Sequence, residues 1–198
     1  MKKVFFVMSI FLFFFASCGD DAYEITPEIG TYAIEEPRER FAELLDFQEA
    51  LEVFTEGMEA EILDIETGIT YRVRRVTGGY NTLADVETLT LQDTERLLET
   101  AGGEWNIRRR AVIVMAGERR IAASIAPFEH SGSEEHPFGE IIDNRSGGTG
   151  TGVNLNYIRG NGMVGVVDIF FFNSLIPGIN RVDERHQEMV LRAYDFEG

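Results

Sequence analysis

The chain has 198 residues, with 34 acidic against 18 basic side chains and a formal net charge of −16. A surface this acidic repels nucleic acids and anionic lipid headgroups, which excludes a nucleic-acid-binding protein. Cys18 is the single cysteine, so the chain cannot form an internal disulfide.

The N-terminal residues read MKKVFFVMSIFLFFFASC, in which two lysines, an apolar run and small residues precede the cysteine. This order is typical of a secretory signal. The apolar run is too short to span a bilayer as a mature helix, so we expect it to be removed. An ordinary signal peptide with an incidental cysteine is one interpretation of this pattern.

The stretch FASC also resembles the lipobox of bacterial lipoproteins. That resemblance implies a signal peptide over residues 1–17 and a lipid on Cys18. It further implies an extracytoplasmic protein of the cell envelope, anchored to a bacterial membrane through that lipid. A lipidated Cys18 would leave the mature domain without a thiol, which excludes a cysteine nucleophile and a Cys-ligated metal site.

Residues 18–36 are acidic, rich in Pro, Gly and Thr, and show no hydrophobic periodicity, so they predict a flexible tether. Residues 37–198 are long enough for one domain with its own core. Without Lys2 and Lys3 the chain carries 16 basic and 34 acidic residues, a net charge of −18.

The first half of this domain predicts two helices and a hairpin. Apolar residues at roughly helical spacing predict a helix from Pro37, with Gly57 as its stop. The stretch EAEILDIETGITYRVRRV predicts a hairpin that turns at residues 66–68. A second helix is predicted from Leu91 to Ala101, with Thr90 as its N-cap and Gly102 after its end.

The second half predicts more strands and a closing helix. The stretch AVIVMAGERRIAASIAPF predicts a hairpin, which is followed by a long loop over residues 127–150. Strands are predicted over 152–158 and 164–172, and a helix over 183–194 with Asp183 as its cap. The fold class is therefore α+β: a single domain with a mainly antiparallel sheet built from hairpins and flanked by about three helices.

One acidic residue, Asp168, lies inside the apolar stretch VGVVDIFFFNS. Strand alternation places it on the same face as Val166 and Phe170. An ionised carboxylate in an apolar layer costs several kcal/mol unless it is paired. We expect His130 to be its partner, with Arg181 as the second choice.

The long loop offers other candidate patterns. His130 and His136 lie among glutamates, but their spacing matches no metal signature, so neither a metal nor a cofactor is expected. The stretch SGGTGTG lacks the helix and lysine of a phosphate loop. Ser131 or Ser174 could join His130 and Asp85 in a triad, but no nucleophile elbow surrounds either serine.

Several stretches in the same order resemble an uncharacterised extracytoplasmic domain of Gram-positive cell-wall proteins, often found beside peptidoglycan-binding modules. They include ILDIETGITYRVRRVTGG, ADVETLTLQDTERL, GGEWNIRRRAVIV, RRIAASIAPFEHSG and NRVDERHQEMV. That domain is itself distantly similar to L,D-transpeptidases, which cross-link peptidoglycan through a cysteine acyl-enzyme.

Carried over position by position, the resemblance places the cysteine of that family at Asp168 and two of its histidines at Val166 and Phe170. Of its histidines only His130 remains. A carboxylate is a poor acyl nucleophile, so the resemblance implies a pseudoenzyme. The candidate catalytic residues that remain are His130, Asp168, Asp85 and Glu87, and the candidate binding residues are Trp105, Arg108, Arg109 and Arg181.

Two functions stay open at this point, besides a purely structural lipoprotein whose domain only supports assembly with another chain. The first is a membrane-tethered, non-catalytic domain that binds peptidoglycan or an envelope protein. The second is a hydrolase or transferase that acts on cell-wall peptides through rebuilt Asp/His chemistry. The second requires the Asp168 carboxylate to lie within about one water's reach of another polar group.

Overall fold

A computed structural model describes residues 40–79, 81–143 and 150–198. These residues lie in one compact unit, which spans Arg38–Gly198. The predicted signal peptide, Cys18, the tether and most of the SGGTGTG stretch lie outside the described residues.

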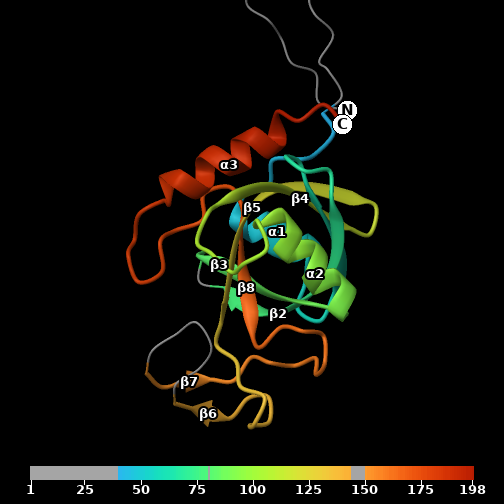
Figure 1. Ribbon diagram of the computed structural model, residues 1–198. Helices are drawn as coiled ribbons and strands as arrows, with labels where there is room; N and C mark the ends of the chain where they lie inside the picture. Colours follow the sequence, from blue (N-terminus) through green and yellow to red (C-terminus); the bar gives the residue numbers. More distant parts are fainter. Residues whose placement is uncertain (1–39, 80, 144–149) are drawn as a thin grey trace, which may run out of the picture. The chain divides into compact units, whose positions relative to one another are not determined.

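Six antiparallel strands close into a barrel, in the order β1-β2-β3-β8-β5-β4 (Figure 1). The strands are β1 (Glu59–Asp64), β2 (Thr70–Gly79), β3 (Leu83–Thr88), β4 (Arg110–Ala116), β5 (Arg119–His130) and β8 (Val166–Phe170). The predicted α+β class with a mainly antiparallel sheet is confirmed, as are the two hairpins β1–β2 and β4–β5. Closure follows because β1 pairs with both β2 and β4.

Alternation along the strands divides the barrel into an inner and an outer wall. Ala84, Val86, Val167 and Ile169 belong to the interior cluster and are fully buried. Each fully buried aliphatic side chain of Val or Ile size contributes about 1.5–3 kcal/mol to folding. The residues between them, such as Asp168, therefore belong to the outer wall.

Three helices pack on this barrel: α1 (Phe47–Val53), α2 (Leu91–Thr100) and α3 (Glu184–Tyr194). Helix α3 covers β4 and β5, where its Val190 and Ala193 pack against Ala111 and Ala122 (Figure 1). A small sheet of β6 (Ile141–Ile142) and β7 (Gly152–Val153) lies at the other end of the molecule from α3 (Figure 1). The predicted helices α2 and α3 are confirmed, with Thr90 and Asp183 as their N-caps.

The helix predicted from Pro37 is wrong for its first part. Glu43 forms a parallel bridge with Ile121, and Asp46 forms one with Phe172, so this segment is extended. Its apolar residues serve two clusters, since Leu44 packs with the α3 cluster and Leu45 with the barrel interior. The apolar spacing that predicted a helix therefore belongs to an extended segment, and both sides of this segment pack against the domain.

Three further boundaries differ from the sequence prediction, and β3 is a strand that was not predicted. Strand β5 runs on to His130, so the long loop begins later than expected. The strand predicted over 152–158 is limited to β7, and the strand predicted over 164–172 is limited to β8. The sequence did not predict β3, because Asp85 and Glu87 on its outer face are residue types that strands disfavour.

Candidate functional site

The carboxylates of Asp85 and Asp168 lie on the outer wall of the barrel and form the centre of the candidate site. In the β3–β8 ladder Asp85 lies directly opposite Asp168. Side chains at such paired positions are neighbours, and like charges there are destabilising unless another group compensates them. The sheet register therefore creates a place that needs a hydrogen-bonding or cationic partner.

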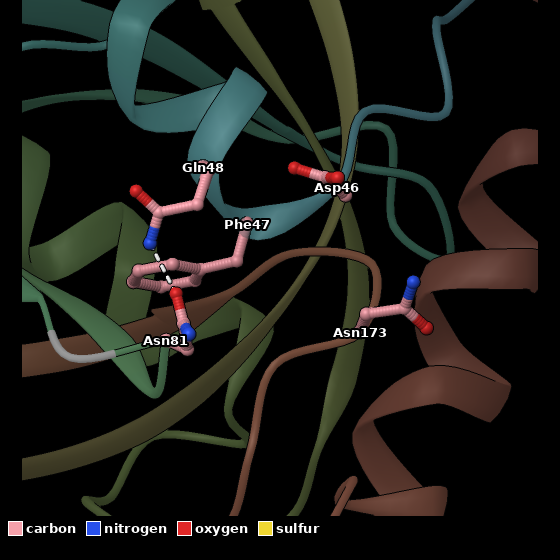
Figure 2. Close-up of a pocket in the computed structure, with 5 residues that line it drawn as sticks. All are labelled: Asp46, Phe47, Gln48, Asn81 and Asn173. Carbon is pink, nitrogen blue, oxygen red and sulfur yellow. Dashed lines mark hydrogen bonds between the residues drawn. The ribbon is translucent and has the colours of Figure 1, made fainter.

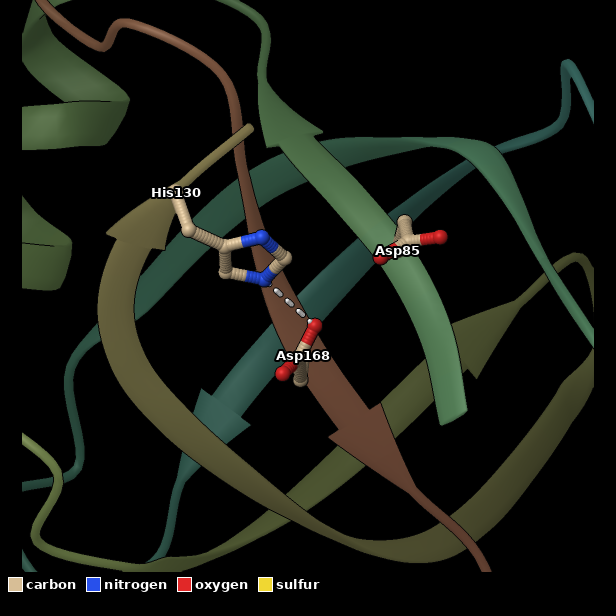
Figure 3. Close-up of side chains that lie close together, drawn as sticks. All are labelled: Asp85, His130 and Asp168. Carbon is tan, nitrogen blue, oxygen red and sulfur yellow. Dashed lines mark hydrogen bonds and ion pairs between the residues drawn. The ribbon is translucent and has the colours of Figure 1, made fainter. Parts of the chain in front are cut away.

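His130 supplies that partner from the end of β5. Its Nε2 lies 2.8 Å from Oδ1 of Asp168, which confirms the predicted pairing. The imidazole and the Asp85 and Asp168 carboxylates each offer one ligand atom, and these three atoms lie within 4.8 Å of one another (Figure 3). The three side chains come from β5, β3 and β8, and their convergence depends on the closed order of the strands.

A register shift in β5 orients the His130 side chain toward the two carboxylates. The β5–β8 register shifts between Ala126 and His130, which re-aims the side chains at the end of β5. Gly132 and Gly165 then let the two chain segments meet, because a Cβ on Gly165 would overlap the His130 carbonyl oxygen. The close approach that Gly132 and Gly165 permit therefore helps to determine the position of the His130 imidazole.

Replacing Gly165 by alanine is expected to cost about 1–2 kcal/mol for its φ of +111° and about 1–3 kcal/mol for the overlap. Gly68→Ala is the matched control, because Gly68 has a φ of +71° with open space around its Cβ position. Urea unfolding of both variants measures the difference. Equal destabilisation would show that the close approach at Gly165 is not a constraint.

Ser131 holds the other side of the His130 ring. Its Oγ lies 2.7 Å from Nδ1 of the imidazole, and its backbone adopts a left-handed φ of 59°. A serine rarely adopts such a conformation, and residues that do so often belong to functional sites. Both ring nitrogens of His130 therefore have defined neighbours, which fixes the orientation of the ring.

The cluster is buried on one side and open on the other. Asp85 is 7% exposed, whereas the side chains of His130 and Asp168 are 21% and 20% exposed. Burial, and then the charge of Asp168, raise the pKa of Asp85 to about 7. The guanidinium of Arg75 opposes this rise, but it donates to carbonyl oxygens such as that of Phe54, at 2.6 Å.

Asp85 also borders a hollow with a volume of about 440 Å³. It is lined by Glu56, Thr77, Gly78, Gly79, Thr82, Leu83 and Asp85. Sequence reasoning missed this hollow, although the stretch TGGYNTLAD, with its adjacent glycines before Asp85, is a signal for a turn with an open backbone. A ligand could approach the cluster from here.

A smaller hollow, of about 160 Å³, lies beside α1 (Figure 2). The amide of Gln48 donates to Oδ1 of Asn81 across it. Its one carboxylate, Asp46, is already the N-cap of α1 and accepts from the Glu49 N–H. This hollow therefore offers amides rather than acid–base groups.

Glu87 lies two residues from Asp85 on β3 but has a different role. Its fully buried carboxylate accepts hydrogen bonds from the backbone N–H groups of Tyr157 and Ile158. The amide of Asn161 lies 3.4 Å from it. Burial raises the pKa of Glu87 to about 7, which these hydrogen bonds oppose. Glu87 thus fixes the segment that precedes β8.

The four predicted binding residues do not join the cluster. Trp105 packs against the barrel core, and Arg108 is exposed with only a 4.0 Å ion pair to Glu66. Arg109 and Arg181 line one hollow of about 320 Å³ near the start of α3. Arg181, the second choice as partner of Asp168, therefore lies elsewhere.

The other loop groups have separate partners. His136 lies 3.2 Å from Glu140, and Glu134 pairs with Arg159.

Of the two serines proposed for a catalytic triad, Ser174 accepts a hydrogen bond from the N–H of Phe171. Only Ser131 lies against His130. In the part of the chain that the structure describes, one group of His and carboxylate side chains has metal-like spacing, and it is Asp85, His130 and Asp168.

A buried pair that the sequence did not indicate lies further along the same wall. Nδ1 of His186 lies 2.8 Å from Oγ of Ser124, and the His186 ring stacks on Phe170. Because both residues are almost fully buried, this pair stabilises the packing of α3 on the barrel.

Comparisons with known proteins give no relative for this chain. No family model, no curated protein and no solved structure matches it. Within the described ranges, no helix has the length and apolar character needed to cross a membrane. The geometry of the site is therefore the basis on which a function can be proposed.

Proposed function

We propose that this domain is the extracytoplasmic part of a lipid-anchored envelope protein, and that it hydrolyses amide bonds in cell-wall peptides. The observation that carries the catalytic part is the convergence of Asp85, His130 and Asp168. The geometric requirement for rebuilt Asp/His chemistry is met, since Asp168 lies 2.8 Å from an imidazole nitrogen.

The contacts of His130 and Asp168 suit general acid–base catalysis at this cluster. Asp168 orients the imidazole from one side and Ser131 from the other. Because both ring nitrogens of His130 are hydrogen-bonded, the second carboxylate oxygen of Asp168 is the atom of this pair that can accept a proton from a water. The partial exposure of His130 and Asp168 leaves room for that water at the open side of the cluster.

The reaction is an ordinary addition of water across a peptide bond. The water oxygen bonds to the carbonyl carbon, and its proton passes to the Asp168–His130 pair. The C–N bond then breaks, and the same pair returns the proton to the leaving amine. The hollow beside Asp85 is also lined by Glu56, Thr77 and Thr82, whose polar side chains suit a peptide ligand.

The lipid anchor belongs to this proposal because of the lipobox-like FASC stretch. Multiple acyl chains on Cys18 would give stable attachment, since each buried CH₂ contributes about 0.8 kcal/mol. A tethered, acidic domain would then meet polymers of the envelope rather than nucleic acids.

The test incubates the full chain, kept in detergent, with purified sacculi and with soluble muropeptides, and measures released peptides by mass spectrometry. Asp168→Asn is expected to lower the rate at least about 100-fold, the lower end of a general acid–base contribution. His136→Gln, on the exposed loop, is the matched control and should retain the full rate.

Retention of the protein on sacculi without hydrolysis, equal for the wild type and Asp168→Asn, would overturn the catalytic proposal. That result would favour the non-catalytic envelope-binding function instead.

A further inference from the structure

We infer that Asp85, His130 and Asp168 form a site for a divalent transition-metal cation of the Zn²⁺ type. This inference rests on the proposed function, because it supplies that hydrolytic site with its cofactor. The three ligand atoms already lie within 4.8 Å of one another. A tetrahedral zinc with bonds of about 2.0–2.2 Å holds its ligand atoms about 3.3–3.6 Å apart, so small side-chain rotations complete the set.

The charges at the cluster favour a cation. The register places two carboxylates opposite each other on the outer wall, and one imidazole lies between them and Ser131. The nearest buried guanidinium, Arg75, points its N–H groups at the carbonyl oxygens of Phe54, Thr77 and Gly78. A divalent ion would neutralise both carboxylates directly, which a proton shared by Asp168 and His130 does for only one of them.

The donor types indicate which cation fits. One imidazole nitrogen with two carboxylate oxygens suits zinc or manganese, whereas Ca²⁺ and Mg²⁺ prefer oxygen ligands alone. The side chains of His130 and Asp168 keep about a fifth of their surface exposed. A bound ion would therefore hold water at its open position, as catalytic zinc sites do.

Ser131 completes the arrangement as an outer-shell partner. Ligating histidines almost always donate their second ring N–H to an oxygen, which fixes the tautomer that ligates. Oγ of Ser131 lies 2.7 Å from Nδ1, so it can accept that proton, and the lone pair of Nε2 then faces the position of the ion beside Asp168. The left-handed backbone of Ser131 and the glycines at 132 and 165 hold this geometry.

The bound ion would supply a water of lowered pKa and polarise the substrate carbonyl. The chain's own groups would hold the ion, and the second carboxylate oxygen of Asp168 would take the water's proton and return it to the leaving amine in place of the Asp168–His130 pair. Sequence reasoning expected no metal, because the three ligands are separated by 45 and 38 residues and form no motif. Their proximity arises only in the folded barrel.

The test strips the full chain with a chelator, dialyses it, and titrates it with ZnCl₂ by calorimetry. One Zn²⁺ per chain is expected. Asp85→Asn, His130→Gln and Asp168→Asn should each weaken binding more than 100-fold, and Ser131→Ala should weaken it about 10- to 100-fold, as outer-shell changes do. Circular dichroism shows that each variant is folded, and Mn²⁺ binding followed by EPR gives a second readout.

His136→Gln is the matched control, because it removes an exposed histidine from the nearby loop. Loss of Zn²⁺ binding in this control, with full binding in Asp85→Asn, would assign the ion to the loop and overturn the inference. A folded wild type that takes up no Zn²⁺ would overturn it too.

The outcomes for metal and for hydrolysis can be separated. Hydrolysis that persists after chelation, in a protein without bound metal, sinks the metal site and leaves the proposed function intact. Stoichiometric Zn²⁺ binding that needs all three ligands, without peptide release, supports the site and sinks the function.

Discussion

Replacement of Arg110 by methionine is expected to lower the free energy of unfolding by about 3–5 kcal/mol. Arg110 lies in β4 and is 4% exposed, while Asp64 at the end of β1 is fully buried. The guanidinium donates to both carboxylate oxygens, with Nη2 at 2.7 Å from Oδ1. Removing Arg110 would leave a buried carboxylate without its cation, and such a charge is more costly than the pair is favourable.

Asp64 also links this pair to the β1–β2 turn. Its carboxylate accepts from the N–H groups of Glu66 and Thr67, so a change at Arg110 should loosen the turn as well. The matched control is Arg119→Met, which removes a pair with Glu43 whose side chains are about half exposed. Exposed pairs contribute about 0–1 kcal/mol. Guanidinium unfolding of both variants would contradict the prediction if their midpoints shifted equally.

Acid is expected to destabilise the protein through His186. Burial, followed by the charge of Arg109, lowers the pKa of His186 to about 3, although Asp183 opposes the shift. In the unfolded chain a histidine titrates near pH 6.5, so between these values the unfolded state binds the extra proton. The stabilisation from neutral His186 is therefore complete above about pH 6.5 and is lost as the pH falls toward 3.

At about 1.4 kcal/mol per pH unit this effect reaches on the order of 5 kcal/mol at the acid end. His186→Gln keeps a hydrogen-bonding group for Ser124 but cannot titrate. Urea unfolding at several pH values should give a flatter profile for this variant than for the wild type. His136→Gln, which changes an exposed histidine, should follow the wild type. Parallel wild-type and His186→Gln profiles would contradict the assignment.

Local signals in the sequence predicted the elements that depend on local physics. The turn at residues 66–68 and the caps Thr90 and Asp183 depend on side-chain and backbone preferences of neighbouring residues, and each is present. The error before α1 has a local signal too, since Asp46 and Glu49 form a capping box that marks the true start of the helix.

The site could be predicted only in part. The apolar surroundings of Asp168 demanded a partner, and His130 was expected because it is the histidine that the chain retains from the family pattern it resembles. Neither argument places Asp85 opposite Asp168, because that follows from the β3–β8 register, and β3 itself was not predicted. Barrel closure depends on pairing between β1 and β4, which no single stretch of sequence encodes.

The location of the cluster on the outer wall separates two tasks that many proteins combine. Val167 and Ile169 fill the interior, while Asp168 between them contributes nothing to that core. Evolution or design can therefore exchange the side chain at 168, and those at 85 and 130, with little rearrangement of the barrel interior. The packing of the barrel interior therefore does not depend on which side chains occupy these three positions of the outer wall.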